Sequence, residues 1–128
     1  MSAFIILGVE DVLELQGRQI GMFGGISGLR DAAVLESACH APHNVLYSEN
    51  GDLVDCAAAL MWHLCCDHPS LDGNKRIGTV AGIVMLSANG VLLPDDDVFQ
   101  SKLIELMMDT AGHRTTRQDI AHFIRQYL

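Results

Sequence analysis

The 128-residue sequence has few aromatic residues, few prolines and few basic residues. Aromatics make up 5% of the chain and prolines number three, whereas hydrophobic residues reach 49%. This composition excludes a disordered chain and predicts one domain, residues 1–128, with a core of small aliphatic side chains. Eight Lys and Arg stand against sixteen Asp and Glu, giving a formal net charge of -8. We therefore expect no nucleic-acid partner, and any phosphate binding to be local.

The four cysteines lack the spacing of a secreted disulfide framework or of a Cys-x-x-Cys pair. They are Cys39, Cys56, Cys65 and Cys66. We expect buried structural thiols in a reducing, cytoplasmic compartment. The alternative is a zinc site in a nearby group of possible ligands, His63, Cys65, Cys66, Asp67 and His68. Adjacent cysteines on a helix point about 100° apart, so they rarely bind the same ion.

Long apolar segments are also missing. The longest uncharged run, residues 77–93, is interrupted by glycine and polar residues and is shorter than the ~20 apolar residues that span a bilayer. Residues 1–7 are apolar but have neither a basic region nor a small-residue cleavage site, so they do not read as a secretory signal. We expect no membrane partner, and a buried central helix within 77–93.

The spacing of the remaining apolar residues predicts an all-α fold of about six helices in one bundle. Pro42 is expected to end the second helix, which leaves residues 43–51 as a loop or short flap. Asp95 to Asp97 are interpreted as capping charges at a helix start, with cation binding as the alternative. The expected helices cover about 9–22, 31–40, 52–67, a central segment from about 74, 95–108, and a last helix from about 116.

The residue types that could bind a ligand or take part in catalysis are concentrated in residues 68–76, which read His-Pro-Ser-Leu-Asp-Gly-Asn-Lys-Arg. Helical spacing places His68 at the inner end of a buried helix, where an isolated histidine is usually a satisfied core residue. The Asp72-Gly73-Asn74 break then starts a new helix, whose N-terminus attracts anions. Gly73 allows the positive φ that an anion-binding backbone turn requires.

Lys75 and Arg76 stand at the start of that expected helix. Two cations there are commonly a solvated surface pair. Because they oppose the helix dipole, they cost stability unless an anion is bound. The whole run therefore predicts a site that holds a polyphosphate beside a reacting hydroxyl.

This run resembles the signature of the Fic/Doc superfamily, His-x-Phe-x-Asp/Glu-Gly-Asn, followed by Gly or Lys and then Arg. The matching residues are His68, Asp72, Gly73, Asn74, Lys75 and Arg76. Other segments resemble the Doc branch: 18–20, 24–25, 28–31 and 35–38 upstream, and Leu-Ser-Ala-Asn-Gly at 86–90 downstream. The resemblance covers most of the chain, from about residue 10 to 128, and implies an all-α fold whose motif loop joins two central helices.

By resemblance, His68 is the general base that takes the proton of the attacking hydroxyl, a role that suits imidazole. Asp72 would hold Mg²⁺ against the phosphates of ATP. Gly73 and Asn74 belong to the phosphate-binding turn, and Lys75 and Arg76 would orient the polyphosphate and absorb developing charge.

Lys75 and Thr79 indicate which reaction the resemblance implies. Fic enzymes that transfer AMP usually carry a second glycine where this chain has Lys75, and a second arginine where it has Thr79. Both differences point to Doc-like proteins, which transfer the terminal phosphate of ATP. The implied target is a hydroxyl of a translation factor, elongation factor Tu, with arrest of translation by a toxin. AMP transfer to a protein is the alternative.

Three further expectations follow from the resemblance. Ser70 replaces the phenylalanine that anchors the motif loop, so a degenerate module that binds nucleotide or antitoxin without turnover is a third hypothesis. Leu46 and Tyr47 lie where the family has a target-docking flap, although an ordinary surface loop is equally expected. The sequence shows no Ser/Thr-x-x-x-Glu inhibitory helix, which favours inhibition in trans by an antitoxin whose tail folds onto this protein.

Overall fold

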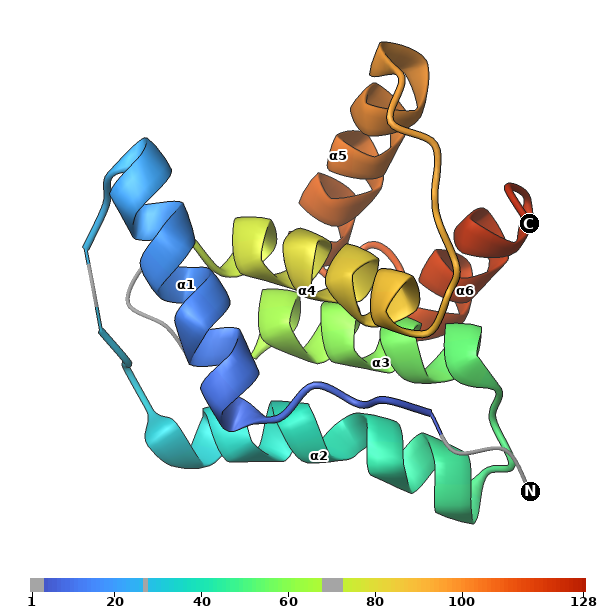
Figure 1. The fold of residues 1–128 in the computed structure, drawn as a ribbon, viewed down its shortest axis with the longest axis horizontal. Coiled ribbons are helices and arrows are strands. Elements are labelled where there is room, and N and C mark those ends of the chain that lie inside the picture. Colours follow the sequence, from blue (N-terminus) through green and yellow to red (C-terminus); the bar gives the residue numbers. More distant parts are fainter. Residues whose placement is uncertain (1–3, 27, 68–72) are drawn as a thin grey trace.

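The computed structural model describes residues 4–26, 28–67 and 73–128, and these parts contain six α-helices (Figure 1). The prediction of an all-α fold is confirmed. No helix in the described ranges is long and apolar enough to cross a membrane. The helices are α1 (Val9–Phe23), α2 (Ala32–Ser48), α3 (Leu53–Cys66), α4 (Asn74–Ala88), α5 (Asp97–Ala111) and α6 (Arg117–Arg125).

Helix α3 is the centre of the fold and packs against α2, α4, α5 and α6 (Figure 1). It is apolar on nearly every side, as expected of a helix with neighbours all around it. Ten of its fourteen residues are buried: Val54, Cys56, Ala57, Ala58, Ala59, Leu60, Met61, Leu64, Cys65 and Cys66. Alanines predominate in its middle turns, so the neighbouring helices can approach closely.

Two glycines bring α4 directly against α3. A Cβ added at Gly82 would lie 2.2 Å from Met61 Sδ, and one added at Gly78 would lie 2.9 Å from the Met61 carbonyl oxygen. At Gly78 the opposing atom belongs to the backbone, so this close approach requires glycine, whereas at Gly82 the Met61 side chain would have to move. Gly78 also faces Cys65 near the end of α3. The first turns of α4 are therefore held beside the last turns of α3.

The predicted end of the second helix at Pro42 is wrong, because α2 continues to Ser48 with Pro42 inside it. Proline in a helix interior costs about 3 kcal/mol relative to alanine. Here burial offsets that cost, since Pro42 and Val45 are both buried and the Pro42 carbonyl accepts a hydrogen bond from Cys56 Sγ at 3.4 Å. Leu46 and Tyr47 consequently lie on a helix, and the predicted loop over residues 43–51 shrinks to the link between α2 and α3.

Several helix starts have the capping residues that the sequence predicts. Asp31 accepts hydrogen bonds from the amides of Ala33 and Val34 at 2.9 and 3.3 Å. Asp96 accepts one from the Phe99 amide at 2.9 Å, which confirms the capping interpretation of this acidic segment for Asp96. Thr116 caps α6 in the same way.

Asn89 ties the N-terminal segment to the end of α4. Its Oδ1 accepts a hydrogen bond from the Ile5 amide at 2.7 Å, and its Nδ2 donates to the Ile5 carbonyl at 2.8 Å. One side-chain amide thus mimics the pairing of a neighbouring strand. Because α4 ends at Ala88, the predicted buried helix is shorter than residues 77–93, and Leu92 is exposed.

The buried face of α1 includes a polar residue. Val12 is buried, Leu13 is exposed, and Gln16 takes the next buried place along the helix. Gln16 Nε2 donates a hydrogen bond to the Gly28 carbonyl at 3.0 Å. A buried polar side chain of this kind is stable because it is hydrogen-bonded, and it fixes the segment that follows α1.

Candidate functional site

The second half of the predicted motif forms the start of α4. Gly73 precedes the helix with φ 76° and ψ 18°, in the left-handed region, as predicted. A Cβ at Gly73 would meet no atom within 4 Å, so the backbone conformation rather than lack of space favours glycine here. Asn74, Lys75 and Arg76 follow in the first turn. His68, Ser70 and Asp72 lie outside the described residues.

The first turn of α4 has an unusual charge for a helix start. It contains no acidic residue and two cations, Lys75 and Arg76, and its N-cap residue, Gly73, supplies no capping side chain. By contrast, α1, α3, α5 and α6 each have an acidic residue in the first turn, and Asp31 caps α2. Cations at a helix N-terminus are unfavourable by about 0.3–1 kcal/mol each. Lys75 and Arg76 therefore oppose the dipole of α4 rather than stabilise the start of the helix.

Lys75 and Arg76 are both exposed, and within the described ranges neither forms an ion pair with a carboxylate. Arg76 instead lies over an aromatic ring, with its guanidinium carbon 4.8 Å from the centroid of Phe23. Phe23 is the last residue of α1. Within the described ranges, the cationic charge at the start of α4 is therefore not paired with a carboxylate.

A groove of about 740 Å³ runs along this turn, between α4 and the second half of α5. Its α4 wall is polar, and its α5 wall is apolar. Ile104 and Met108 on the α5 wall are 57% and 55% exposed, so both present apolar surface to the groove. The residues that line the groove are Gly73, Asn74, Lys75, Arg76, Thr79, Val80, Ile104, Met107, Met108 and Ala111.

The cysteines near the motif are structural. Cys65 Sγ lies 3.6 Å from the Met107 carbonyl, and Cys66 Sγ donates to the Thr110 carbonyl at 3.1 Å. Burial raises the pKa of the Cys65 thiol to about 12 and that of Cys66 to about 11. These groups remain protonated at neutral pH, as the prediction of buried thiols requires. The described part of the chain has no group of three residues able to hold a metal.

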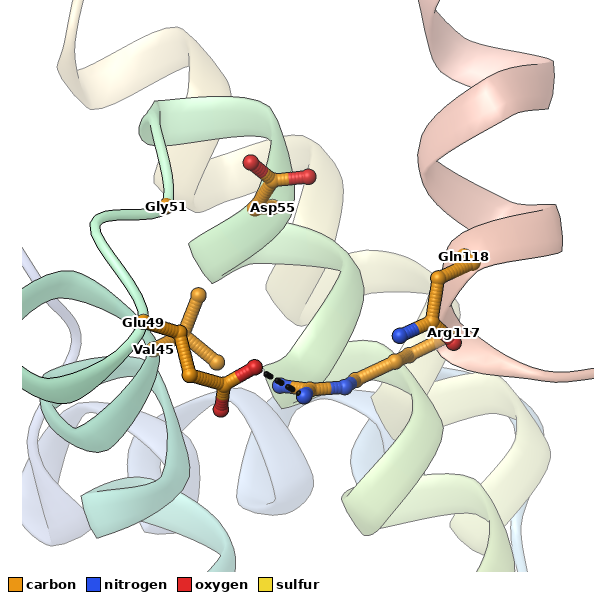
Figure 2. Close-up of a pocket in the computed structure, with 6 residues that line it drawn as sticks. All are labelled: Val45, Glu49, Gly51, Asp55, Arg117 and Gln118. Carbon is orange, nitrogen blue, oxygen red and sulfur yellow. Dashed lines mark hydrogen bonds and ion pairs between the residues drawn. The ribbon is translucent and has the colours of Figure 1, made fainter.

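A second, smaller cavity of about 170 Å³ lies at the other end of α3, and Figure 2 shows the residues around it. Glu49 and Arg117 form an ion pair across it, with Arg117 Nη2 2.5 Å from Glu49 Oε1. Nearby, Arg125 Nη2 lies 2.9 Å from both Asp52 and Asp55. In contrast to the start of α4, the cations here are neutralised.

Leu46 and Tyr47, the predicted docking residues, belong to this second region. They lie in the last turns of α2, which leads by a short link to the start of α3. A fourteen-residue helix is about 20 Å long, so α3 separates them from the start of α4. Tyr47 is 76% exposed and stacks with His43 at 6.4 Å between ring centroids. Their docking role stays a prediction, but they do not line the groove beside Lys75 and Arg76.

Comparison with known proteins identifies the family. A model described as the Fic/DOC family matches residues 6–86, which is more than half of the chain. The chain belongs to the Fic/Doc family. It is also 38% identical over 102 residues to a protein named Toxin Doc from Mycolicibacterium smegmatis (strain ATCC 700084 / mc(2)155), covering 77% of each chain. The predicted resemblance to the Doc branch is confirmed.

The position of Thr79 is one at which this chain differs from other members of the Fic/Doc family. Thr79 lines the groove one helical turn after Lys75, and its hydroxyl donates to the Lys75 carbonyl at 2.8 Å. Fic enzymes that transfer AMP usually have an arginine at this position. In this Fic/Doc protein the groove wall carries a neutral, internally bonded side chain there.

Sequence reasoning missed Phe23, Ile104 and Met108. The helical period assigns core residues well, but it does not show which exposed apolar residues gather around a site. Phe23 stands directly before the Gly24-Gly25 pair that resembles the family, and that position was the available signal. No comparable signal marks Ile104 or Met108, because they reach the groove only through the packing of α5 against α4.

Proposed function

We propose that this protein is a Doc-like toxin that transfers the terminal phosphate of ATP to a hydroxyl group of a protein. The observation that carries the proposal is the first turn of α4, where two cations without a carboxylate partner in the described ranges line a large groove. A Fic/Doc chain with this arrangement is suited to a ligand that brings several negative charges, such as a triphosphate.

The proposed contribution of this turn is electrostatic. Phosphoryl transfer needs little covalent chemistry from the protein, so positioning and charge stabilisation provide most of the catalysis. The N–H groups of the first turn point out of the helix, and the helix dipole adds partial positive charge at the same place. Lys75 and Arg76 supply full charges beside it. Arg76 can also bind two phosphate oxygens at once, because its guanidinium is planar.

His68 and Asp72 complete the proposal by their positions in the family motif. His68 is proposed to take the proton of the attacking hydroxyl. Asp72 is proposed to bind Mg²⁺, since a carboxylate together with phosphate oxygens is the ligand set that this ion prefers. Mg²⁺ offsets phosphate charge when bound. The chain's own residues then orient the phosphates and accept the proton.

The acceptor is proposed to be a protein segment rather than a small solute. The wall of the groove opposite the cations is apolar, and Ile104 and Met108 are more than half exposed there. A polar metabolite would gain little from such a wall, whereas side chains flanking a Ser or Thr hydroxyl would bury apolar area against it. By resemblance the acceptor is a translation factor, elongation factor Tu, and its modification arrests translation.

The toxin assignment is supported by the name of the 38% identical relative, Toxin Doc. We infer a cytoplasmic toxin that is restrained by an antitoxin binding in trans. Expression of the chain alone should then stop growth of a bacterial host, and growth should recover when its antitoxin is produced. A host that grows normally despite a soluble, folded product would contradict the toxin assignment.

Mass measurement of the acceptor tests the reaction. Incubation of the protein with ATP, Mg²⁺ and elongation factor Tu should add the mass of one phosphate to the factor. His68→Ala should abolish the addition while nucleotide binding is retained. An adduct of AMP mass would replace the kinase assignment with AMP transfer. Binding of nucleotide without any adduct, reversed by Ser70→Phe, would identify a degenerate member.

A further inference from the structure

An exposed aromatic ring holds the motif arginine. Phe23 is 60% exposed, although burial of a large apolar side chain stabilises a protein. Its ring centroid lies 4.8 Å from the guanidinium carbon of Arg76. This distance is well within the range of about 6 Å over which a cation and a ring attract each other.

The ring is an unusual partner for an arginine in this chain. Arg18, Arg114, Arg117 and Arg125 all pair with carboxylates, at distances between 2.5 and 2.9 Å. With sixteen acidic residues against eight basic ones, carboxylate partners are abundant. Arg76 nevertheless has an aromatic partner and no carboxylate in the described ranges.

The two kinds of partner have different chemical consequences. A carboxylate occupies the N–H donors of a guanidinium and cancels its charge. An aromatic ring contacts the guanidinium face and leaves the N–H groups at its edge, and the full charge, available to an anion. A ring therefore limits the motion of the side chain without reducing its ability to bind phosphate.

The backbone fixes where this ring lies. Helix α1 ends at Phe23, where the Gly24 amide donates to the Ile20 carbonyl at 2.8 Å and Gly24 adopts φ 77°. A positive φ at this position turns the chain directly after the helix, as glycine readily allows. Helix α1 also packs against α4 (Figure 1). Phe23 therefore stays beside the first turn of α4.

We infer that Phe23 is a positioning residue, which holds the Arg76 guanidinium in place for the phosphates without neutralising it. The inference rests on the proposed phosphate transfer and adds to it a residue outside the family motif. The ring contacts Arg76, and its effect on the reaction passes through Arg76. It follows that loss of the ring weakens the nucleotide interaction and leaves the acceptor interaction unchanged.

Three variants separate this role from a general structural one. Phe23→Leu keeps an apolar side chain but removes the ring, Phe23→Tyr keeps the ring, and Met22→Leu changes a neighbour at the same helix end that is 72% exposed. Phe23→Leu should raise the Kd for Mg-ATP and the KM for ATP about twofold to fivefold. Phe23→Tyr and Met22→Leu should match the wild type. The KM for the acceptor protein and the melting temperature should be the same in all four proteins.

A second measurement asks whether Phe23 acts through Arg76. In an Arg76→Ala background, Phe23→Leu should cause no further rise in the Kd for Mg-ATP. A rise of the same size as in the wild-type background would overturn the inference, as would a Phe23→Leu protein with wild-type Kd and KM. A wild-type protein that binds no Mg-ATP and transfers nothing would remove the proposed function and this inference with it. An active wild type with an unaffected Phe23→Leu variant would remove the inference alone.

Discussion

The two ends of α3 present the same residue type in opposite settings. At the start of α3, Arg117 and Arg125 are neutralised by Glu49, Asp52 and Asp55. Beyond its other end, Arg76 lies on an aromatic ring at the positive end of α4. The first arrangement joins α6 to α3 and the α2 link, and it requires nothing else. The second leaves Arg76 without a carboxylate partner in the described ranges, and this difference is the reason we propose the ligand site there.

The largest expected effect comes from replacing Arg76 by alanine, with a separate replacement of Arg117 as the control. Arg76→Ala should lower kcat/KM for phosphate transfer by about 10²- to 10³-fold, because a charge that stabilises the transferring phosphate is lost. Its melting temperature should change little, because removing a cation from the positive end of α4 offsets the loss of the exposed contact with Phe23. Arg117→Ala is the matched control and should retain transfer activity. Equal losses of transfer activity in both variants would contradict the proposed difference between the two ends of α3.

The second prediction concerns the packing that carries the site. Gly78→Ala should lower the free energy of unfolding by about 1–3 kcal/mol, because its Cβ would lie 2.9 Å from the Met61 carbonyl oxygen. It should also reduce transfer, since α4 must shift away from α3. Denaturant unfolding and the transfer assay measure the two effects.

Gly17→Ala in α1 is the control for Gly78. A Cβ at Gly17 meets nothing within 4 Å, so this change should raise the free energy of unfolding by about 0.5–1 kcal/mol. A Gly78→Ala protein as stable as Gly17→Ala would contradict the close approach of α3 and α4.

The third prediction tests whether the α5 wall of the groove contacts the acceptor protein rather than the nucleotide. Met108→Ser should raise the KM for the acceptor protein by about three- to tenfold, because truncating a contact residue at an interface costs on the order of 1 kcal/mol. The KM for ATP should stay the same. Val98→Ser, an exposed change on the same helix that does not line the groove, should leave both constants unchanged. A higher KM for ATP alone would assign the α5 wall to the nucleotide.

The smallest expected effect is at the ion-paired end. Arg125→Ala should lower the free energy of unfolding by only about 0.2–1 kcal/mol, because the pairs are largely exposed to solvent and screened. Partial burial would raise the pKa of the Asp52 carboxyl, but the Asp55 amide and Arg125 outweigh it and hold that pKa below its ordinary value of 3.8.

The pH dependence of stability follows from this lowered pKa. The folded state binds its proton less readily than the unfolded state, so the stabilisation is present above pH 3.8 and is lost as the pH falls through the folded-state value. Urea unfolding at pH 7 and at pH 3 measures the difference between wild type and Arg125→Ala. That difference should shrink at the lower pH. A difference that grows on acidification would contradict this sign.

Local signals predicted much of this molecule. Asp31, Asp96 and Thr116 cap helices as their sequence positions suggest, and Gly73 takes the positive φ expected of it. Each of these features depends on residues a few positions away, so both partners of the interaction can be found in one short segment of sequence. The spacing of apolar residues likewise predicted a helix over residues 52–67, where the structure has α3.

Features that depend on distant contacts were not predictable in the same way. Pro42 is an effective helix breaker locally, yet burial against α3 keeps it inside α2. Met108 has an apolar side chain of the kind usually found in a core, yet it lines the groove between α4 and α5. Phe23 and Arg76 are more than fifty residues apart, and only the packing of α1 on α4 brings them together.

The most direct test of the account is to observe where the nucleotide binds. Backbone amide resonances of the unmodified protein can be followed by NMR during titration with Mg-ATP. We expect the amide resonances of Lys75, Arg76 and Thr79 to shift, and those of Glu49, Asp52 and Arg117 to stay unchanged. Shifts gathered at the ion-paired end of α3, or no shifts at saturating Mg-ATP, would contradict it.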